Sequence, residues 1–287
     1  MASDEAVIPA GLSLLTARQS VNHDFSSVFV ARSLSEMKTA ESTRGSYVFP
    51  VRLAEDSRLL SANRGTSNIR TDALGASLST RTPEEVLAYV YSVLHSPKYR
   101  HRYAGALRIE FPKIPKDYPE DLADSLCRLG AELIALHLME SPKLNHFITT
   151  YTGPKNPEVG RVGWSDDTVW LDAGKTSARE GHNATVPGSI GFKHVPKDVW
   201  DFHIGGYQVC HKWLSDRKGR ILSKEDIEHY HRIVVSLSET IRLMKEIDEV
   251  IEQHGGWPGA FQVASVAERI DARQILKVAE PKTTYGD

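Results

Sequence analysis

Short apolar runs separated by polar turns mark the first fifty residues of the chain. Three of these runs are rich in β-branched or aromatic residues: GLSLLTAR (11–18), SSVFVAR (26–32) and SYVFPVRL (46–53). This pattern predicts three strands. Residues 54–81 are instead rich in Ser, Arg, Asn and Thr and show little periodicity. They predict a long loop or insertion, which in a compact domain is usually functional or disordered.

Two helices are predicted in the middle of the chain. Thr82, Pro83 and Glu85 form a capping-box signature, and apolar residues then recur every three or four positions. This helix should end at His95-Ser96, because the residue before a proline disfavours helical geometry. Leucines at spacings of four and three predict a second helix over 119–139. The proline-punctuated residues between the two helices, 107–121, predict an extended segment.

Strand-like and loop-like segments return after residue 141. The predicted strands are HFITTY (146–151), GRVGW (160–164), DTVWLD (167–172) and SIGFKHV (189–195), with an insertion at 173–188. A capped helix of 29 residues is predicted from Ser223, with Asp226 as its capping partner, and it would span roughly 43 Å. Its apolar seam predicts packing against a neighbouring helix, and a partner-binding coiled coil is the alternative. A short helix is predicted over 263–277.

These elements predict an α+β fold, with short-stranded mixed sheets, several packed helices and a long C-terminal helix. The predicted organisation is one recognition region over 1–255, divided into two lobes near residue 140. A tail over 256–287 follows, carrying the short helix.

Positive charge is concentrated in particular segments, although the chain as a whole is nearly neutral. The net charge of the 287 residues is only −2. However, residues 98–116 contain six basic side chains against the single acid Glu110. The basic side chains are Lys98, Arg100, Arg102, Arg108, Lys113 and Lys116, and a looser run comprises Arg52, Arg58, Arg64, Arg70 and Arg81. Solvation of ordinary surface explains most such charges, but a concentrated basic segment is typical of phosphate binding.

Targeting and redox signals are weak. No apolar run approaches the roughly 18 residues of a membrane helix, and the N-terminus carries acids where an export signal carries Lys or Arg. Cys127 and Cys210 do not make a disulfide framework, and both fall in helical patterns. We therefore expect a cytoplasmic protein that has no membrane partner.

Motifs for catalysis are incomplete. The Gly174-Lys175-Thr176 fragment lacks the preceding glycine of a phosphate loop, because position 169 is Val. His229 and His231 are two residues apart and cannot share a helical face, so we expect no metal site. Asp166-Asp167 predicts solvated surface. The Asn/Asp-Pro-Pro-Tyr/Phe tetrapeptide and glycine-rich cofactor loop of amino-methyltransferases are absent.

Several unrelated sequence tokens occur in an order that resembles one protein family. They are LLTARQ (14–19), VFV (28–30), YVFP (47–50), Tyr89 through Arg100, FPKIP (111–115), IGGYQV (204–209), KWL (212–214) and DRKGR (216–220). Over roughly residues 11–250 the chain resembles the C-terminal specificity region of type ISP restriction–modification enzymes. Those large bacterial proteins join a nuclease, a helicase-like motor, an N6-adenine methyltransferase and a target-recognition domain.

The resemblance implies a non-catalytic module that reads double-stranded DNA. The methyltransferase and helicase portion that it serves is then expected on another chain, or has been lost. S-adenosylmethionine and ATP are then expected only in those missing parts, and no cofactor in this chain. The expected DNA-binding residues are Arg18, Gln19, Arg64, Arg70, Lys98, Arg100, Arg102, Lys113, Lys116, Lys175, Arg217, Lys218 and Arg220. Unmatched loops at 54–81 and 173–188 are where base contacts are expected.

Within the 199–248 segment we expect scaffold more than chemistry. Trp200, Tyr207 and Trp213 are interpreted as core aromatics, with stacking platforms for bases as the alternative, and Gly205-Gly206 as a turn or a close backbone approach. Residues 216–220 are interpreted as a solvated turn or, alternatively, a phosphate clamp. Two other functions stay open: a nuclease or hydrolase that uses Asp166, Asp167 and the histidines, and an interaction protein that docks a partner through the long helix.

Overall fold

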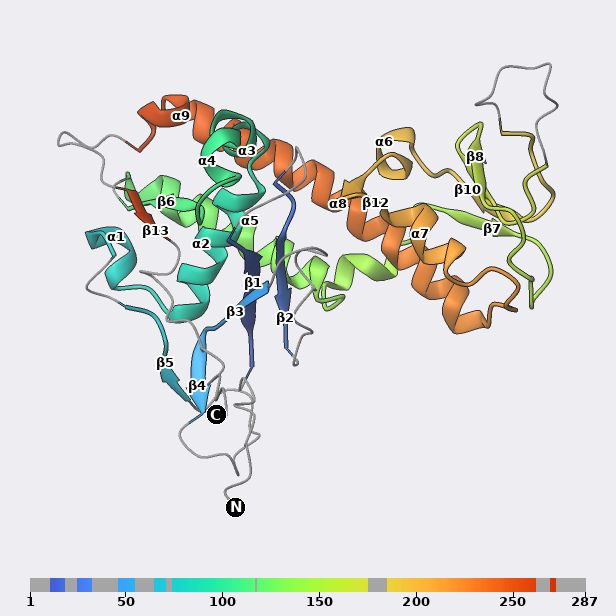
Figure 1. Cartoon of the computed structure of the whole chain (residues 1–287), viewed down its shortest axis with the longest axis horizontal. Coiled ribbons are helices and arrows are strands. Elements are labelled where there is room, and N and C mark those ends of the chain that lie inside the picture. Colours follow the sequence, from blue (N-terminus) through green and yellow to red (C-terminus); the bar gives the residue numbers. More distant parts are fainter. Residues whose placement is uncertain are drawn as a thin grey trace, which may run out of the picture. The chain divides into compact units, whose positions relative to one another are not determined.

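A computed structural model of the chain describes residues 11–18, 25–32, 46–54, 65–70, 74–116, 118–174, 185–261 and 269–271. The chain divides into two compact units, Met1–Leu138 with Leu243–Asp287, and Met139–Arg242. Figure 1 shows the elements of both units along the sequence. The assignment of residues 1–255 to one recognition region stays a prediction.

Two packed helices form the centre of the first unit, α2 (Pro83–His95) and α5 (Glu120–His137). The predicted capping box is confirmed: the Glu85 amide donates to Thr82 Oγ1 (3.3 Å), and the Thr82 amide donates to Glu85 Oε2 (2.8 Å). Ten consecutive residues of α2, Val86 to His95, are buried. The two helices approach closely at Gly130 of α5, because a Cβ atom there would lie 1.8 Å from the Ala88 carbonyl oxygen.

The N-terminal strands are confirmed and form a three-stranded antiparallel sheet, in the order β2 (Val28–Ala31), β1 (Ser13–Ala17), β3 (Ser46–Pro50). A second pair joins β4 (Arg52–Ala54) to β5 (Gly65–Ser67). The predicted 54–81 loop therefore contains β5 and the short helix α1 (Ala76–Ser79), while much of the remainder lies outside the described residues.

The tail differs from its prediction. Part of the expected 263–277 helix is a strand, β13 (Arg269–Asp271), which pairs antiparallel with β6 (Lys113–Pro115). Backbone groups of a strand need hydrogen-bond partners, and β6 obtains them from a segment about 150 residues away in sequence. A local periodicity argument could not detect that pairing.

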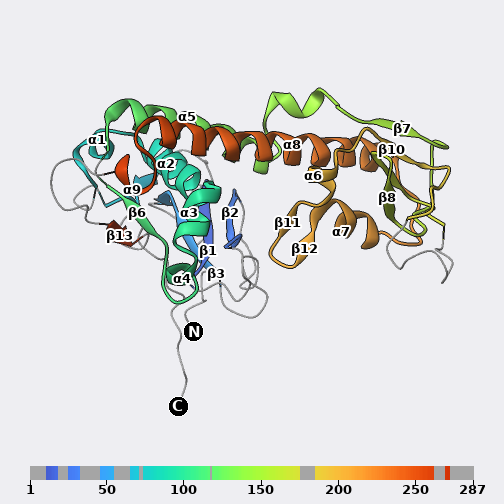
Figure 2. The same ribbon diagram turned by 90° about the horizontal axis from the view of Figure 1, so that it is seen from above.

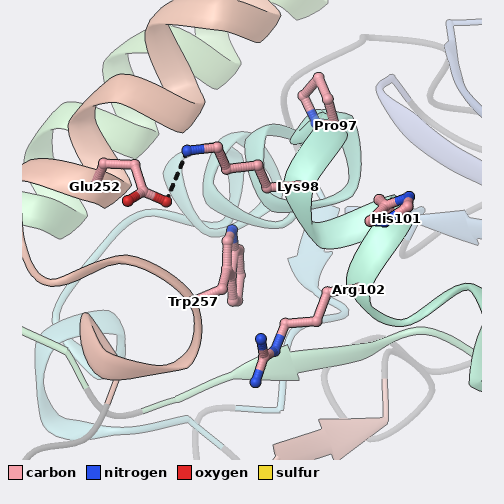
Figure 3. A pocket seen from close by; sticks show the side chains of 6 residues that line it. All are labelled: Pro97, Lys98, His101, Arg102, Glu252 and Trp257. Carbon is pink, nitrogen blue, oxygen red and sulfur yellow. Dashed lines mark ion pairs between the residues drawn. The ribbon is translucent and has the colours of Figure 1, made fainter.

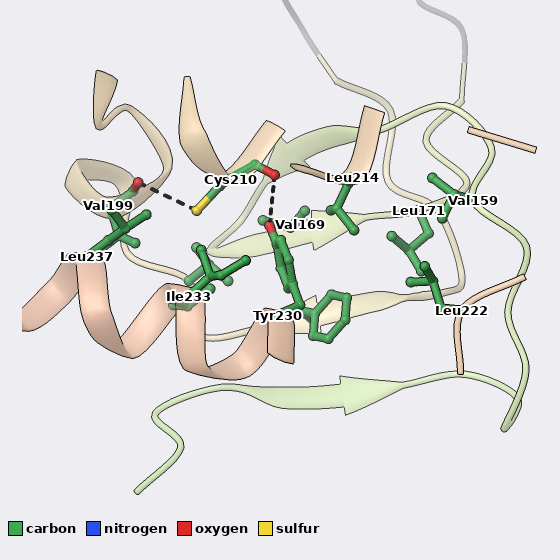
Figure 4. Close-up of a cluster of buried hydrophobic side chains, with 13 residues drawn as sticks. Val159, Val169, Leu171, Val199, Cys210, Leu214, Leu222, Tyr230, Ile233 and Leu237 are labelled. Atoms are coloured by element: carbon green, nitrogen blue, oxygen red, sulfur yellow. Dashed lines mark hydrogen bonds between the residues drawn. The ribbon is translucent and has the colours of Figure 1, made fainter. Parts of the chain in front are cut away.

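The second unit is built around a four-stranded antiparallel sheet, in the order β7 (Thr150–Thr152), β10 (Gly191–Lys193), β9 (Thr168–Trp170), β8 (Gly163–Ser165). All four strands overlap predicted ones. Its other elements are the 3₁₀ turn η2 (Pro142–Asn145), α6 (Lys197–Trp200), the hairpin of β11 (His203–Ile204) and β12 (Tyr207–Gln208), and α7 (Val209–Ser215). Figure 4 shows the core, where Tyr230 lies among Val169, Leu214 and Ile233.

The long helix is confirmed as α8 (Lys224–Gln253), 30 residues long. Its start matches the prediction, because the Asp226 amide donates to Ser223 Oγ (3.2 Å) and the Ser223 amide to Asp226 Oδ2 (3.0 Å). Along its seam Tyr230 and Val234 are buried in the second unit, and Ile247 and Ile251 in the first. The seam is therefore covered by the chain itself, which removes the basis for a partner-binding coiled coil.

The α+β class is confirmed, and its sheets are small and antiparallel. Among the described residues, no helix is long and apolar enough to cross a membrane.

Candidate nucleic-acid interface

The basic segment 98–116 is partly helical. Lys98, Arg100 and Arg102 lie on α3 (Pro97–Arg102), which is followed by α4 (Ala104–Leu107). Ser96 caps α3 by accepting a hydrogen bond from the Tyr99 amide (3.0 Å), and Pro97 occupies the first helical position. The proline that ends α2 thus also begins a new helix, because its fixed φ suits the first turn.

A buried carboxylate from α8 completes this helix start. Asp248 accepts hydrogen bonds from the Ser96 hydroxyl (2.5 Å) and from the Lys98 amide (3.1 Å), and only 8% of the residue is exposed. Burial raises the pKa of the Asp248 carboxyl, against the lowering effect of the Ser96 hydrogen bond. The carboxylate occupies the first turn of α3, so that turn offers no free anion site.

Replacing Asp248 with alanine should lower the free energy of unfolding by about 2 kcal/mol, because buried Ser96 and Lys98 donors would lose their acceptor. Asp248→Asn keeps one acceptor oxygen and should cost clearly less. Urea unfolding of the two variants beside the wild type measures this difference. Equal losses for Ala and Asn would show that the contact is not a hydrogen-bonded cap.

The six basic side chains of 98–116 differ in their exposure and in the contacts that they make within the protein. Arg100 Nε donates to the Leu94 carbonyl oxygen at 2.6 Å, at the end of α2. Lys113 pairs with Glu110 at 3.1 Å, and Lys98 pairs with Glu252 at 2.8 Å. Arg102 is exposed, with its guanidinium 5.9 Å from the Tyr103 ring centroid. Arg108 is exposed and Lys116 is half-buried.

Arg102 borders an open hollow in the first unit, of about 410 Å³, which we call the α3 hollow (Figure 3). It is lined by Pro97, Lys98, His101, Arg102, Glu252 and Trp257. Trp257 Nε1 donates to Ser96 Oγ at 3.3 Å, and its ring stacks on Phe261 at 4.3 Å. The hollow is therefore lined both by an anchored aromatic ring and by cationic side chains. Of these cations, Lys98 is already paired with Glu252.

Sequence reasoning did not single out His101, Glu252 or Trp257. His101 and Trp257 each lie near a recognisable signal, since His101 falls inside the basic run and Trp257 follows the Gly255-Gly256 pair. Gly255 and Gly256 have φ values of +104° and +68°, which turn the chain after α8. The helix α9 (Gly256–Gly259) then brings Trp257 back to α3.

The second unit presents its cations on the turn between α7 and α8, residues 216–220, which we call the basic turn. Gly219 has φ +75°, and its amide donates to the Val159 carbonyl oxygen at 2.8 Å. The Val159 amide in turn donates to the Arg220 carbonyl oxygen at 2.9 Å. Two backbone hydrogen bonds thus tie the turn to the edge of the core.

Within the basic turn, Arg217 is already engaged by its own unit. Its guanidinium carbon lies 3.6 Å from the Trp213 ring centroid, and Nη1 donates to the Trp213 carbonyl oxygen at 3.0 Å. Lys218 and Arg220 are exposed. Among the described residues, no ion pair engages either of these two side chains. They are the cations of this turn that remain available for phosphate.

Of the three aromatics expected in the core, Trp200 and Trp213 pack against it, but Tyr207 does not. Tyr207 is 56% exposed. The expectation for Tyr207 was wrong because the residue belongs to the β11–β12 hairpin, whose strands are only two residues long. The predicted turn at Gly205-Gly206 is confirmed, with Gly205 at φ +58°.

The remaining predicted DNA-binding residues do not join these surfaces. Arg18 follows β1 and Arg70 follows β5, and both are exposed. Neither lines the α3 hollow. Gln19, Arg64 and Lys175 lie outside the described residues, as does much of the two loops where base contacts are expected.

Groups that could support an enzymatic alternative have structural roles or poor chemistry. Asp166 and Asp167, at φ +49° and +53°, form the two-residue turn of the β8–β9 hairpin. Burial raises the pKa of the Cys127 thiol to about 11 and that of Cys210 to about 12, which disfavours the thiolate. In the part of the chain that the structure describes, no group of three or more His, Cys, Asp or Glu could hold a metal ion.

Solved structures with a similar fold include two Type ISP restriction-modification enzymes and a further protein solved with DNA. The ATP-dependent Type ISP restriction-modification enzyme LlaBIII bound to DNA aligns with a TM-score of 0.57 and 18% identity, over 85% of this chain and 16% of that one. A nuclease-deletion mutant of the Type ISP enzyme LlaGI in complex with a DNA substrate mimic gives 0.54 and 19%, over 82% and 21%. The DrdV–DNA complex gives 0.58 and 21%, over 82% and 24%.

The chain thus spans less than a quarter of each of these three solved chains. No curated protein matches its sequence. A model of the Type ISP C-terminal specificity domain matches residues 5–246, which is most of the chain. The chain therefore belongs to the Type ISP C-terminal specificity domain family.

Proposed function

We propose that this chain holds and reads duplex DNA as the specificity part of a restriction–modification system. The observation that carries the proposal is the match to the Type ISP C-terminal specificity domain over residues 5–246. The three similar structures described above, all solved with DNA or a DNA mimic, support it. The reaction itself, adenine methylation or DNA cleavage, then belongs to domains or subunits outside this sequence.

The local charge supports this role despite a net charge of −2. Lys218 and Arg220 on the basic turn, and Arg102 at the α3 hollow, are exposed cations on ordered backbone. Contacts of this kind to phosphates fix the register of a protein on DNA, while base-edge contacts select the sequence. We assign the first task to these cations.

We further propose that the chain alone is non-catalytic. The methyltransferase tetrapeptide and its glycine-rich cofactor loop are absent from the sequence. S-adenosylmethionine and ATP would then be bound by the methyltransferase and motor portions, supplied by another chain or an adjoining part of the protein.

The test is DNA binding by the purified chain. A pool of random duplexes is selected over several rounds, and binding to the enriched sequence is measured by mobility shift at rising salt, with and without adenine methylation. We expect one enriched sequence, bound more tightly than unrelated duplex by at least about a thousandfold. No binding even at low salt, or cleavage by the chain alone with a divalent metal, would overturn the proposal.

Substitutions in the basic turn make this binding test quantitative. Lys218→Gln with Arg220→Gln should reduce the slope of log affinity against log salt by about 1.8, because each phosphate contact contributes about 0.9. Lys197→Gln with Lys224→Gln is the matched control. It removes the same charge from two lysines that pair with Asp201 and Glu228, four residues along their helices. An equal change in slope for both pairs would mean that the basic turn has no specific phosphate contact.

A further inference from the structure

The β11–β12 hairpin holds a large aromatic ring in solvent. His203 pairs with Gln208 and Ile204 with Tyr207, which leaves Gly205 and Gly206 as a two-residue turn. A positive φ at the first central residue, as at Gly205, is typical of tight hairpin turns that match strand twist. A Cβ atom on Gly206 would meet only open space, so the tip is bare backbone beside the exposed Tyr207 ring.

The base of this hairpin is anchored to the second unit. Gln208 Nε2 donates to the Trp200 carbonyl oxygen at 2.5 Å, and the Val209 amide donates to the Phe202 carbonyl oxygen at 3.2 Å. Two positions after Gln208, Cys210 is fully buried in the core. The backbone next to Tyr207 is therefore anchored, although more than half of the surface of Tyr207 is exposed.

The surroundings of Tyr207 are polar more than apolar. Lys212 Nζ lies 5.5 Å from its ring centroid and also binds Asp216. The aromatic neighbours Trp200, Phe202 and Trp213 pack on the core, so they do not extend the exposed ring into an apolar patch. A single exposed aromatic ring among polar groups suits a nucleobase or sugar better than an apolar protein surface.

The basic turn lies at the other end of the same short helix. The seven residues of α7 rise about 10 Å, so Tyr207 precedes and the exposed Lys218 follows one rigid segment of that length. The length of α7 is close to the depth of a DNA groove, about 8 Å, over which the phosphates are separated from the base edges. Figure 2 shows the hairpin of β11 and β12 extending away from α8.

We propose that Tyr207 is a base-stacking residue, which enters a groove of the bound duplex and stacks on a base that has been unstacked from its neighbours, while the basic turn holds the phosphate backbone. The inference rests on the proposed DNA-binding function and adds a residue that the sequence had assigned to the core. Aromatic side chains that stack on bases act largely independently of sequence. Tyr207 would therefore strengthen and position the complex, and base selection would come from other residues.

Three variants test the role of Tyr207 on the duplex enriched by the wild-type chain. Tyr207→Ala should weaken binding about tenfold or more, as expected for loss of one stacking contact. Its salt slope should equal that of the wild type, because no charge is removed. Tyr207→Phe keeps the ring and should bind like the wild type. Ile148→Ala removes another exposed hydrophobic side chain of the second unit and should have no effect.

Stacking of Tyr207 on a base can also be measured by fluorescence. With 2-aminopurine placed in turn at each adenine position of the duplex, the wild type and Tyr207→Phe should change the fluorescence at one position, and Tyr207→Ala should not. Equal thermal unfolding of the three proteins checks that the hairpin substitution leaves the fold intact.

The outcomes separate the two proposals. If the wild type binds DNA and Tyr207→Ala binds equally well with the same fluorescence, the stacking role is wrong while the DNA-binding function stands. That result would assign the exposed ring to a protein partner. If the wild type binds no duplex, both proposals fail. A changed salt slope in Tyr207→Ala would also overturn the stacking role, because it indicates that the basic turn has shifted.

Discussion

Gly130→Ala is expected to destabilise the first unit by about 3 kcal/mol, although alanine is the better helix former. A Cβ atom at position 130 would lie 1.8 Å from the carbonyl oxygen of Ala88 and 2.6 Å from its carbonyl carbon. Both are backbone atoms of the neighbouring helix, so no side-chain rotation relieves the overlap. Helices α2 and α5 must move apart, and overpacking of this kind costs about 1–3 kcal/mol or occasionally more.

Gly105→Ala is the matched control for this prediction. Gly105 also lies in a helix, α4, but nothing lies within 4 Å of the position that a Cβ atom would take there. Alanine at this site should be neutral or stabilise the protein by up to about 1 kcal/mol through helix propensity. Urea unfolding of both variants measures the contrast. Equal stability of Gly130→Ala and the wild type would show that α2 and α5 are not in the close contact described.

Acid should weaken the first unit between pH 6.5 and about 4, well before most carboxylates are protonated. His95 of α2 is buried and His137 of α5 is partly buried beside it, with ring centroids 5.4 Å apart. The Tyr91 hydroxyl and His137 Nδ1 share a hydrogen bond of 2.6 Å, and His95 Nδ1 donates to the Tyr91 carbonyl oxygen at 2.8 Å. Burial, together with the smaller effect of nearby Arg100, lowers the pKa of His137 to about 4.

Burial likewise lowers the pKa of His95 well below its usual value. The unfolded chain binds a proton on each ring near pH 6.5, whereas the folded chain keeps both rings neutral. Protons therefore favour the unfolded state, and stability present above pH 6.5 is lost as pH falls toward the folded pKa. A difference of roughly 2.5 pKa units at His137 corresponds to about 3 kcal/mol.

Chemical unfolding at pH 7, 6, 5 and 4.5 measures this loss. His137→Gln removes one titrating group from the cluster and should flatten the profile, even though it lowers stability at pH 7. His101→Gln, at an exposed position on α3, is the control for the histidine-to-glutamine change. A wild-type profile that is flat over this range, or one as steep in His137→Gln, would contradict the prediction.

Helix starts and strand positions were predictable because they depend on residues only a few positions apart. Thr82 with Glu85, and Ser223 with Asp226, form the predicted caps within one helical turn. Gly205-Gly206 likewise supplies its turn from local backbone freedom. The α3 helix was missed because the proline that begins it also ends α2, so the local pattern indicates a helix end there. The β13 strand was missed because β6 supplies its partner.

The candidate surface was predictable only in outline. A concentration of basic residues at 98–116 could be read from the sequence, and so could the basic turn. Which of these cations are free depends on distant atoms: the Leu94 carbonyl oxygen engages Arg100, and Glu252 engages Lys98, while Arg102 stays exposed. The α3 hollow could not be foreseen, because Trp257 reaches α3 only after the turn at Gly255-Gly256.

By itself, the sequence determined the α+β class, the capped helices, the family and the location of its positive charge. Each follows from residue types at short spacings, or from ordered tokens along the chain. Only the tertiary structure decided that Tyr207 points into solvent while Trp200 and Trp213 pack on the core. The reason is physical. The hydrophobicity of a side chain determines the free energy that it gains from burial, but long-range packing decides which side chains are buried.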